Sequence, residues 1–141
     1  MKNILFAFAM IGTVAWWPAH GQAVSTLGYE MVSLKIGLCR EVYRSGALRA
    51  TDRSSAEAGD REYLQCKAGA TADAKKAYSE LNKSLKSKDA KKALKNYHAA
   101  LMSSLESSEP RDGELTSDHR RRVDALDEKV EAAWQLLQLE M

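Results

Sequence analysis

Hydrophobic residues recur at helical spacing between Tyr63 and Leu85. Intervals of three or four residues separate successive apolar positions: Tyr63, Cys66, Ala70, Ala74, Ala77, Leu81 and Leu85. This spacing lines them up on one face of an α-helix. It predicts a long helix from about Ala56 to Lys86 that continues through Gly69, with Ser54 or Ser55 as its N-cap.

The segment before this helix has a similar pattern. Its apolar residues, again three or four apart, are Leu27, Met31, Leu34, Leu38 and Val42. They predict a first helix from about Thr26 to Arg44 that buries this stripe, with Ser45 and Gly46 ending it. Because a glycine inside a helix is unfavourable, Gly37 suggests that a neighbouring segment approaches closely there.

Two more helices are predicted in the second half of the chain. After an interruption at Ser87 to Asp89, a new stripe consists of Ala90, Leu94, Tyr97, Leu101 and Leu105. This predicts a tight helical hairpin and a third helix that ends before Pro110. The last stripe predicts a helix capped by Thr116 or Ser117, and its members are His119, Val123, Leu126, Val130, Ala133 and Leu137.

The predicted fold class is therefore all-α, an antiparallel bundle of about four helices, because short connections make successive helices antiparallel neighbours. The composition, with 45% hydrophobic and 28% charged residues, is that of a globular chain, and we expect a single helical domain over residues 24–141. A hairpin with two loosely packed helices is the alternative, since an alanine-rich stripe buries little area per residue.

The N-terminus has the organisation of a secretory signal peptide. Lys2 precedes an apolar run from Ile4 to Ala15, and the small residues Gly21 and Ala23 suit a cleavage site. We therefore predict a signal peptide over residues 1–23, with Val24 as the first mature residue, or Gln22 at the second candidate site. The apolar run is shorter than the roughly 18 residues that span a membrane. The expected product is periplasmic or secreted, with no stable membrane span after cleavage.

The two cysteines of the chain predict a disulfide. Cys66 belongs to the stripe of the second helix, and Cys39 directly follows Leu38 of the first. Two cysteines in an exported chain usually pair, and antiparallel packing can bring them together. The pair would place the first helix alongside the Tyr63 to Ala77 half of the second.

Charge is nearly balanced overall, with 21 basic and 19 acidic residues, which argues against a nucleic-acid partner. Locally it is uneven. Residues 72–105 carry eight lysines against three acids, and residues 106–141 carry ten acids against five bases. Complementary solvated helix faces are one interpretation. The other is a patch for an anionic partner, formed by Lys75, Lys76, Lys83, Lys86, Lys91, Lys92 and Lys95.

Motifs for catalysis, nucleotide binding and metal binding are missing from the sequence. The mature chain has only His98 and His119, without metal-ligand spacing, and no Gly-x-Ser-x-Gly or phosphate-binding loop occurs. We therefore expect neither an enzyme nor a metal or cofactor requirement.

Two segments resemble parts of known families. The run Leu27, Met31, Leu34, Leu38 resembles the first helix of four-helix periplasmic haem cytochromes, and this implies an axial ligand at Met31. The family's second ligand is a histidine on the last helix, where this chain has His119, and the motif Cys-x-x-Cys-His is missing. The segment from Ala77 to Leu101 is similar to one tetratricopeptide hairpin.

The function expected from the sequence is binding or scaffolding by a small exported helical protein, without turnover. Its partner would be a protein or an anionic envelope component. The alternative is a carrier of a ligand or a haem-like cofactor in the bundle interior.

Overall fold

The computed structural model describes residues 26–141, which form four α-helices and no strand. The helices are α1 (Leu27–Arg49), α2 (Arg53–Ser84), α3 (Lys88–Glu106) and α4 (Thr116–Glu140). This confirms the all-α prediction and the number of helices. The predicted signal peptide lies outside the described residues.

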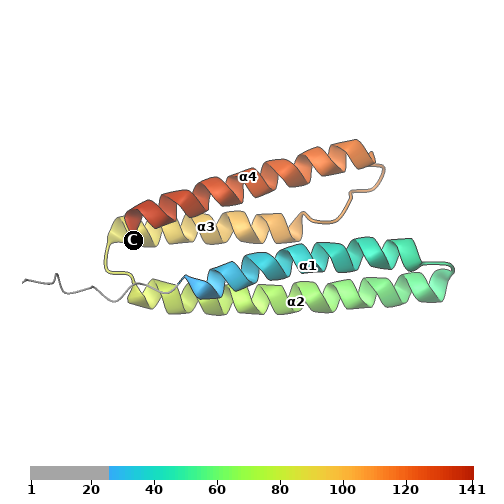
Figure 1. Ribbon diagram of the computed structural model, residues 1–141, viewed down its shortest axis with the longest axis horizontal. Helices are drawn as coiled ribbons and strands as arrows, with labels where there is room; N and C mark the ends of the chain where they lie inside the picture. Colours follow the sequence, from blue (N-terminus) through green and yellow to red (C-terminus); the bar gives the residue numbers. More distant parts are fainter. Residues whose placement is uncertain (1–25) are drawn as a thin grey trace, which may run out of the picture.

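The four helices form two antiparallel hairpins that pack together (Figure 1). α1 lies beside α2, and α3 lies beside α4. The α1–α2 turn and the α3–α4 connection lie at one end of the bundle, while the α2–α3 connection and the C-terminus lie at the other. The α2–α3 connection is short, as predicted, but it covers residues 85–87 rather than Ser87 to Asp89, because Ser87 is the N-cap of α3.

The stripes predicted for α2 and α3 are buried. On α3 every predicted position is at most 3% exposed. Burial of these residues joins the two hairpins in one hydrophobic core. α4 contributes less, since Leu137 is its one fully buried side chain among the described residues, whereas Val130, Ala133 and Trp134 are half-buried against the core.

The buried face of α1 was predicted wrongly. Met31, Leu34 and Leu38 are 59%, 65% and 65% exposed. The buried residues are Tyr29, Val32, Ile36 and Cys39, which also recur every three or four positions. This second stripe is buried because it faces both α2 and α3, where the Tyr29 ring packs edge-on against that of Tyr97, with centroids 5.0 Å apart.

Two glycines of α1 also differ from expectation. Gly46 does not end the helix, which continues to Arg49. It is buried, and a Cβ there would lie 3.2 Å from the Cα of Gly59 on α2, so these two glycines allow the helices to cross closely. Gly37, where a close neighbour was expected, has no atom within 4 Å of a Cβ position.

Helix starts follow capping chemistry that was only partly anticipated. Asp52, rather than Ser54 or Ser55, is the N-cap of α2, and it forms a reciprocal capping box with Ser55. Ser87 caps α3 through its hydroxyl. α4 begins after Leu115 without a side-chain cap, so the predicted capping role of Thr116 or Ser117 is wrong.

Candidate binding surfaces

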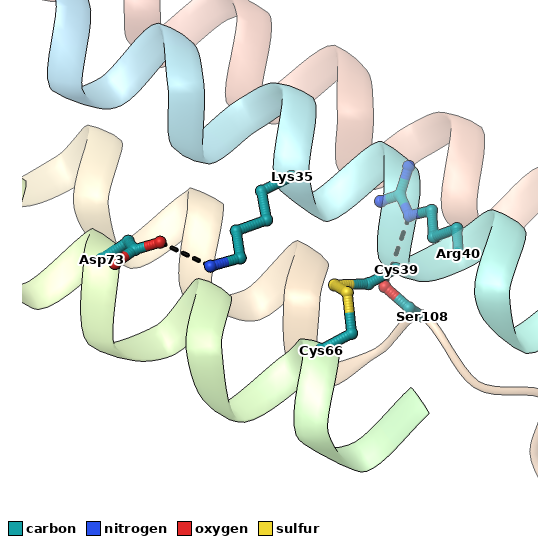
Figure 2. Close-up of a disulfide and its surroundings, with 6 residues drawn as sticks. All are labelled: Lys35, Cys39, Arg40, Cys66, Asp73 and Ser108. Carbon is teal, nitrogen blue, oxygen red and sulfur yellow. Dashed lines mark hydrogen bonds and ion pairs between the residues drawn. A yellow bond between two sulfur atoms is a disulfide. The ribbon is translucent and has the colours of Figure 1, made fainter. Parts of the chain in front are cut away.

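The disulfide joins the two helices of the first hairpin. Cys39 and Cys66 are bonded, with their Cα atoms 5.5 Å apart and 27 positions apart in sequence (Figure 2). The predicted register holds, since Gly28 of α1 lies against Ala77 and the Tyr43 ring packs on Tyr63. Cys39 is only 1% exposed, so the bond serves as a structural link.

An exposed apolar strip runs along α1 beside this disulfide hairpin. It consists of Met31, Leu34 and Leu38, here called the α1 strip, and each side chain is more than half exposed. Together with residues of α2 it lines a groove of about 580 Å³. Single exposed hydrophobic residues are common on protein surfaces, but contiguous ones at helical spacing are characteristic of interaction sites.

Charges of both signs border this groove. Lys35 donates to Asp73 across it at 2.6 Å (Figure 2), and Lys76 and Glu80 line it on α2. An apolar centre with a polar rim is the usual anatomy of a protein interface.

The seven lysines of the predicted anionic-partner patch lie on α2, on α3 and in their connection, and all are exposed. They do not share one face. Lys76 lines the groove between α1 and α2, whereas Lys92 lines a depression between α3 and α4. The pKa of His98 on α3 is lowered first by burial of the imidazole and then by the positive charge of Lys75. None of the seven forms an ion pair with a described residue.

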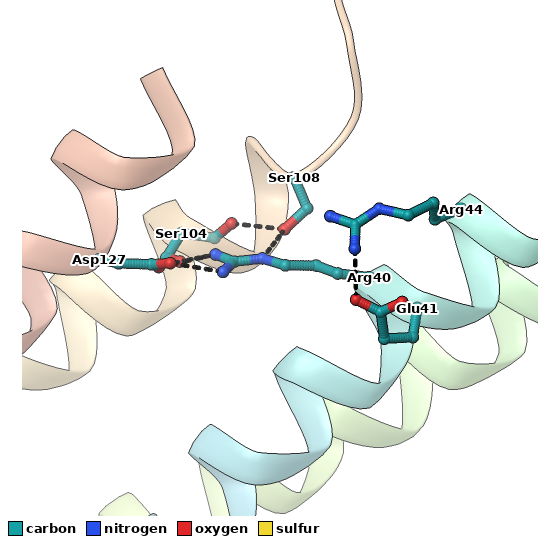
Figure 3. Close-up of polar contacts among 6 residues, drawn as sticks. All are labelled: Arg40, Glu41, Arg44, Ser104, Ser108 and Asp127. Carbon is teal, nitrogen blue, oxygen red and sulfur yellow. Dashed lines mark hydrogen bonds and ion pairs between the residues drawn. The ribbon is translucent and has the colours of Figure 1, made fainter. Parts of the chain in front are cut away.

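A polar network ties α1 to the second hairpin. The guanidinium of Arg40 donates to both carboxylate oxygens of Asp127 on α4, at 2.7 and 2.8 Å. It also donates to the hydroxyls of Ser104 and Ser108, at 2.6 and 3.3 Å (Figure 3). Two parallel bonds to one carboxylate fix the orientation of the arginine. This network holds the middle of α1 against α3 and α4.

A second arginine organises the α3–α4 connection. Arg122 donates to the carboxylate of Glu114 and to the carbonyl oxygens of Ser107 and Glu109. The hydrogen bond from Arg122 is the main reason that the pKa of Glu114 falls to about 2. The connection is therefore fixed to the start of α4, where Nδ1 of His119 lies 3.1 Å from the same guanidinium.

Beside this connection lies a cleft of about 540 Å³ between the C-terminal part of α1 and the start of α4. Its apolar lining comes from Ala47, Leu48, Pro110 and Val123, and its charged lining from Arg40, Arg44, Arg120 and Asp124. Sequence reasoning missed this cleft, because its charged walls are separated by more than 70 residues of chain.

The two residues implied as haem ligands are not brought into one cavity. Met31 lines the groove between α1 and α2, whereas His119 lines the cleft at the start of α4. The other histidine is engaged elsewhere, since the Tyr29 hydroxyl lies 3.0 Å from Nδ1 of His98. Over residues 26–141, no group of three or more His, Cys, Asp or Glu side chains is arranged to hold a metal ion.

Comparison with known proteins adds no family or fold relative: no protein-family model, curated protein or solved structure matches this chain. Among the described helices, none is long and apolar enough to cross a membrane.

Proposed function

We propose that this chain is an exported helical protein that acts by binding or scaffolding, without catalytic turnover. The observation that carries the proposal is the α1 strip. Its three large apolar side chains are 59–65% exposed in a chain whose other helices bury their main stripes. Water contact with such a strip is unfavourable, and covering it with a partner removes that cost.

The chemistry of the groove favours a protein partner with an apolar helix. The groove runs along α1, and an apolar helical face fits such a groove with anchors three or four residues apart. Its rim carries Lys35 and Lys76 as well as Asp73 and Glu80. A rim of both signs matches a partner of mixed charge, whereas an anionic membrane surface selects basic residues.

Export is supported by the covalent chemistry of the fold. Disulfides such as Cys39–Cys66 persist in oxidising compartments and are rare in the cytosol. The signal-peptide pattern of residues 1–23 points to the same compartment. The exported protein should begin at Val24 or at Gln22 by N-terminal sequencing, and an intact Met1 would contradict export by cleavage.

Photo-crosslinking tests the proposed binding surface. A photoreactive amino acid replaces Leu34 in the full chain, which is expressed in cells of its source. A matched probe replaces Leu139, an 82% exposed leucine on α4. We expect a discrete adduct from position 34 and none from position 139. The added change Leu38→Glu should abolish the adduct, because it places a charge in the α1 strip, whereas Leu64→Glu, at a 58% exposed leucine of α2, should not.

Two outcomes would contradict a protein partner at this surface. One is equal labelling from positions 34 and 139, and the other is an adduct at position 34 that persists with Leu38→Glu. An adduct between two copies of the chain would instead identify self-association as the use of the strip.

A further inference from the structure

We propose that the cleft between α1 and α4 binds an amphipathic monoanion with a carboxylate head and an unbranched apolar tail. The cleft lies at the end of the bundle that carries the α1–α2 turn and the α3–α4 connection. It is lined by different residues from the groove beside the α1 strip. Its volume of about 540 Å³ falls within the range of small-molecule sites, roughly 300–1,000 Å³.

The charges that line the cleft favour an anion. Three arginines line it against one carboxylate, that of Asp124. Arg40 is already held by Asp127, whereas neither Arg120 nor Asp124 forms an ion pair with a described residue, so Arg44 and Arg120 face one carboxylate. An arginine without a partner beside an apolar wall offers a planar pair of donors to an incoming carboxylate.

Arg44 supplies the opposite wall. Its guanidinium extends from α1 on the side of Ser108 (Figure 3), and its one ion pair with a described residue is with Glu41, at 2.6 Å. Both side chains of this pair are more than 60% exposed. Exposed pairs contribute little to stability, so a ligand carboxylate can take over the guanidinium at small cost.

The apolar lining determines the rest of the ligand. Leu48 is 81% exposed, although it lies beside Ala47, Pro110 and Val123 in the cleft. An alkyl chain would cover these side chains, which a small inorganic anion would leave in water. The half-buried ring of Tyr43 adds a further apolar wall. The ligand class is therefore a carboxylate with an apolar tail. Inorganic phosphate would leave the apolar lining uncovered, and an alcohol would leave the arginines without an anion.

Calorimetric titration with decanoate tests the site in the mature chain. We expect one molecule bound per chain at up to ~1 mM ligand, and weaker binding at higher salt. Arg44→Gln and Arg120→Gln should each weaken binding by about tenfold or more, because each removes a charge-assisted donor. Arg121→Gln is the matched control on the next residue of α4, outside the cleft lining, and should leave binding unchanged.

Three further measurements keep the proposal falsifiable. Decyltrimethylammonium has the same tail and the opposite charge, so it should not bind. Amide chemical shifts of the unmodified chain should move at Leu48 and Val123 on adding decanoate, which requires no variant. Inorganic phosphate should produce no comparable shifts.

The proposal is overturned if decanoate fails to bind, if both amphiphiles bind equally, or if Arg121→Gln weakens binding as much as Arg120→Gln. Co-sedimentation with vesicles of anionic lipid tests whether the bound anion is instead the head group of a membrane lipid. If the chain binds the vesicles and loses this binding with Arg44→Gln and Arg120→Gln, the cleft recognises the head group of a membrane lipid. That result would overturn the proposal of a free carboxylate ligand. None of these binding measurements bears on the photo-crosslinking at position 34. The proposed ligand of the cleft and the proposed partner of the α1 strip can therefore be disproved independently.

Discussion

Small residues set the closest approach between α1 and α2, whereas large side chains form the contact between α3 and α4. In the first hairpin, Gly46 meets Gly59, and Ala70, Ala74 and Ala77 of α2 are at most 7% exposed. In the second, the Tyr97 ring packs on Trp134 with centroids 5.0 Å apart. The first hairpin therefore brings backbones close together, although the Tyr43 and Tyr63 rings also pack between its helices, and it carries the disulfide.

This difference has consequences for stability and for function. Large buried side chains make the second hairpin sensitive to truncation, because removing atoms leaves a cavity. Close backbone contact makes the first hairpin sensitive to enlargement. The first hairpin also leaves one face of α1 uncovered, and that face is the α1 strip.

The largest expected effect comes from truncating the second hairpin. Leu101→Ala should lower the free energy of unfolding by about 3 to 5 kcal/mol, because Leu101 is 1% exposed in the core. Leu136→Ala on α4, at 59% exposure, should change it by less than about 0.5 kcal/mol. Urea unfolding followed by circular dichroism measures both. Equal effects would mean that α3 does not supply the core.

Removing the disulfide should have the next largest effect. Cys39→Ala with Cys66→Ala opens a loop of 27 residues, and the chain-entropy model puts the loss at about 3 to 4 kcal/mol. The unmodified chain should lose a similar amount in reductant, whereas the double variant should not respond to reductant. A loss below about 1 kcal/mol would show that packing alone holds α1 on α2.

Two glycine substitutions of α1 give the smallest effects and have opposite signs. Gly46→Ala should destabilise by about 1 to 3 kcal/mol, because its Cβ would press on the Gly59 backbone at 3.2 Å. Gly37→Ala should stabilise by roughly 0.5 to 1 kcal/mol, because its Cβ would meet open space and alanine favours a helix. Thermal unfolding of the two variants side by side checks the signs. A stabilising Gly46→Ala would contradict the close crossing.

The sequence was sufficient for the helices, for the stripes of α2, α3 and α4 and for the disulfide, because each depends on local spacing or on cysteine number. It was insufficient for the buried face of α1. Two apolar stripes overlap there, and only the partner helices determine which one is buried. One signal was available: Cys39 is in phase with Tyr29, Val32 and Ile36, so the predicted disulfide already favoured that face.

The cleft at the start of α4 could not be predicted in the same way. Arg44 and Arg120 line the same cleft only because the Arg40 network and Arg122 fix the second hairpin against α1. Nothing in the local spacing of either arginine indicates the other. The Ser54 or Ser55 cap was wrong for a simpler reason, since Asp52 competes for the same role three residues before Ser55.

Oxidation of Met31 tests most directly whether the α1 strip is the binding surface. Met31 is 59% exposed and lies in the strip, whereas Met141, at 42%, is the C-terminal residue and does not line the groove. Brief peroxide treatment followed by mass spectrometry gives the sulfoxide fraction at each methionine. In the purified protein, both should oxidise readily. In the native compartment, Met31 should be protected severalfold while Met141 is not, and equal oxidation of Met31 in the two settings would contradict a partner on the α1 strip.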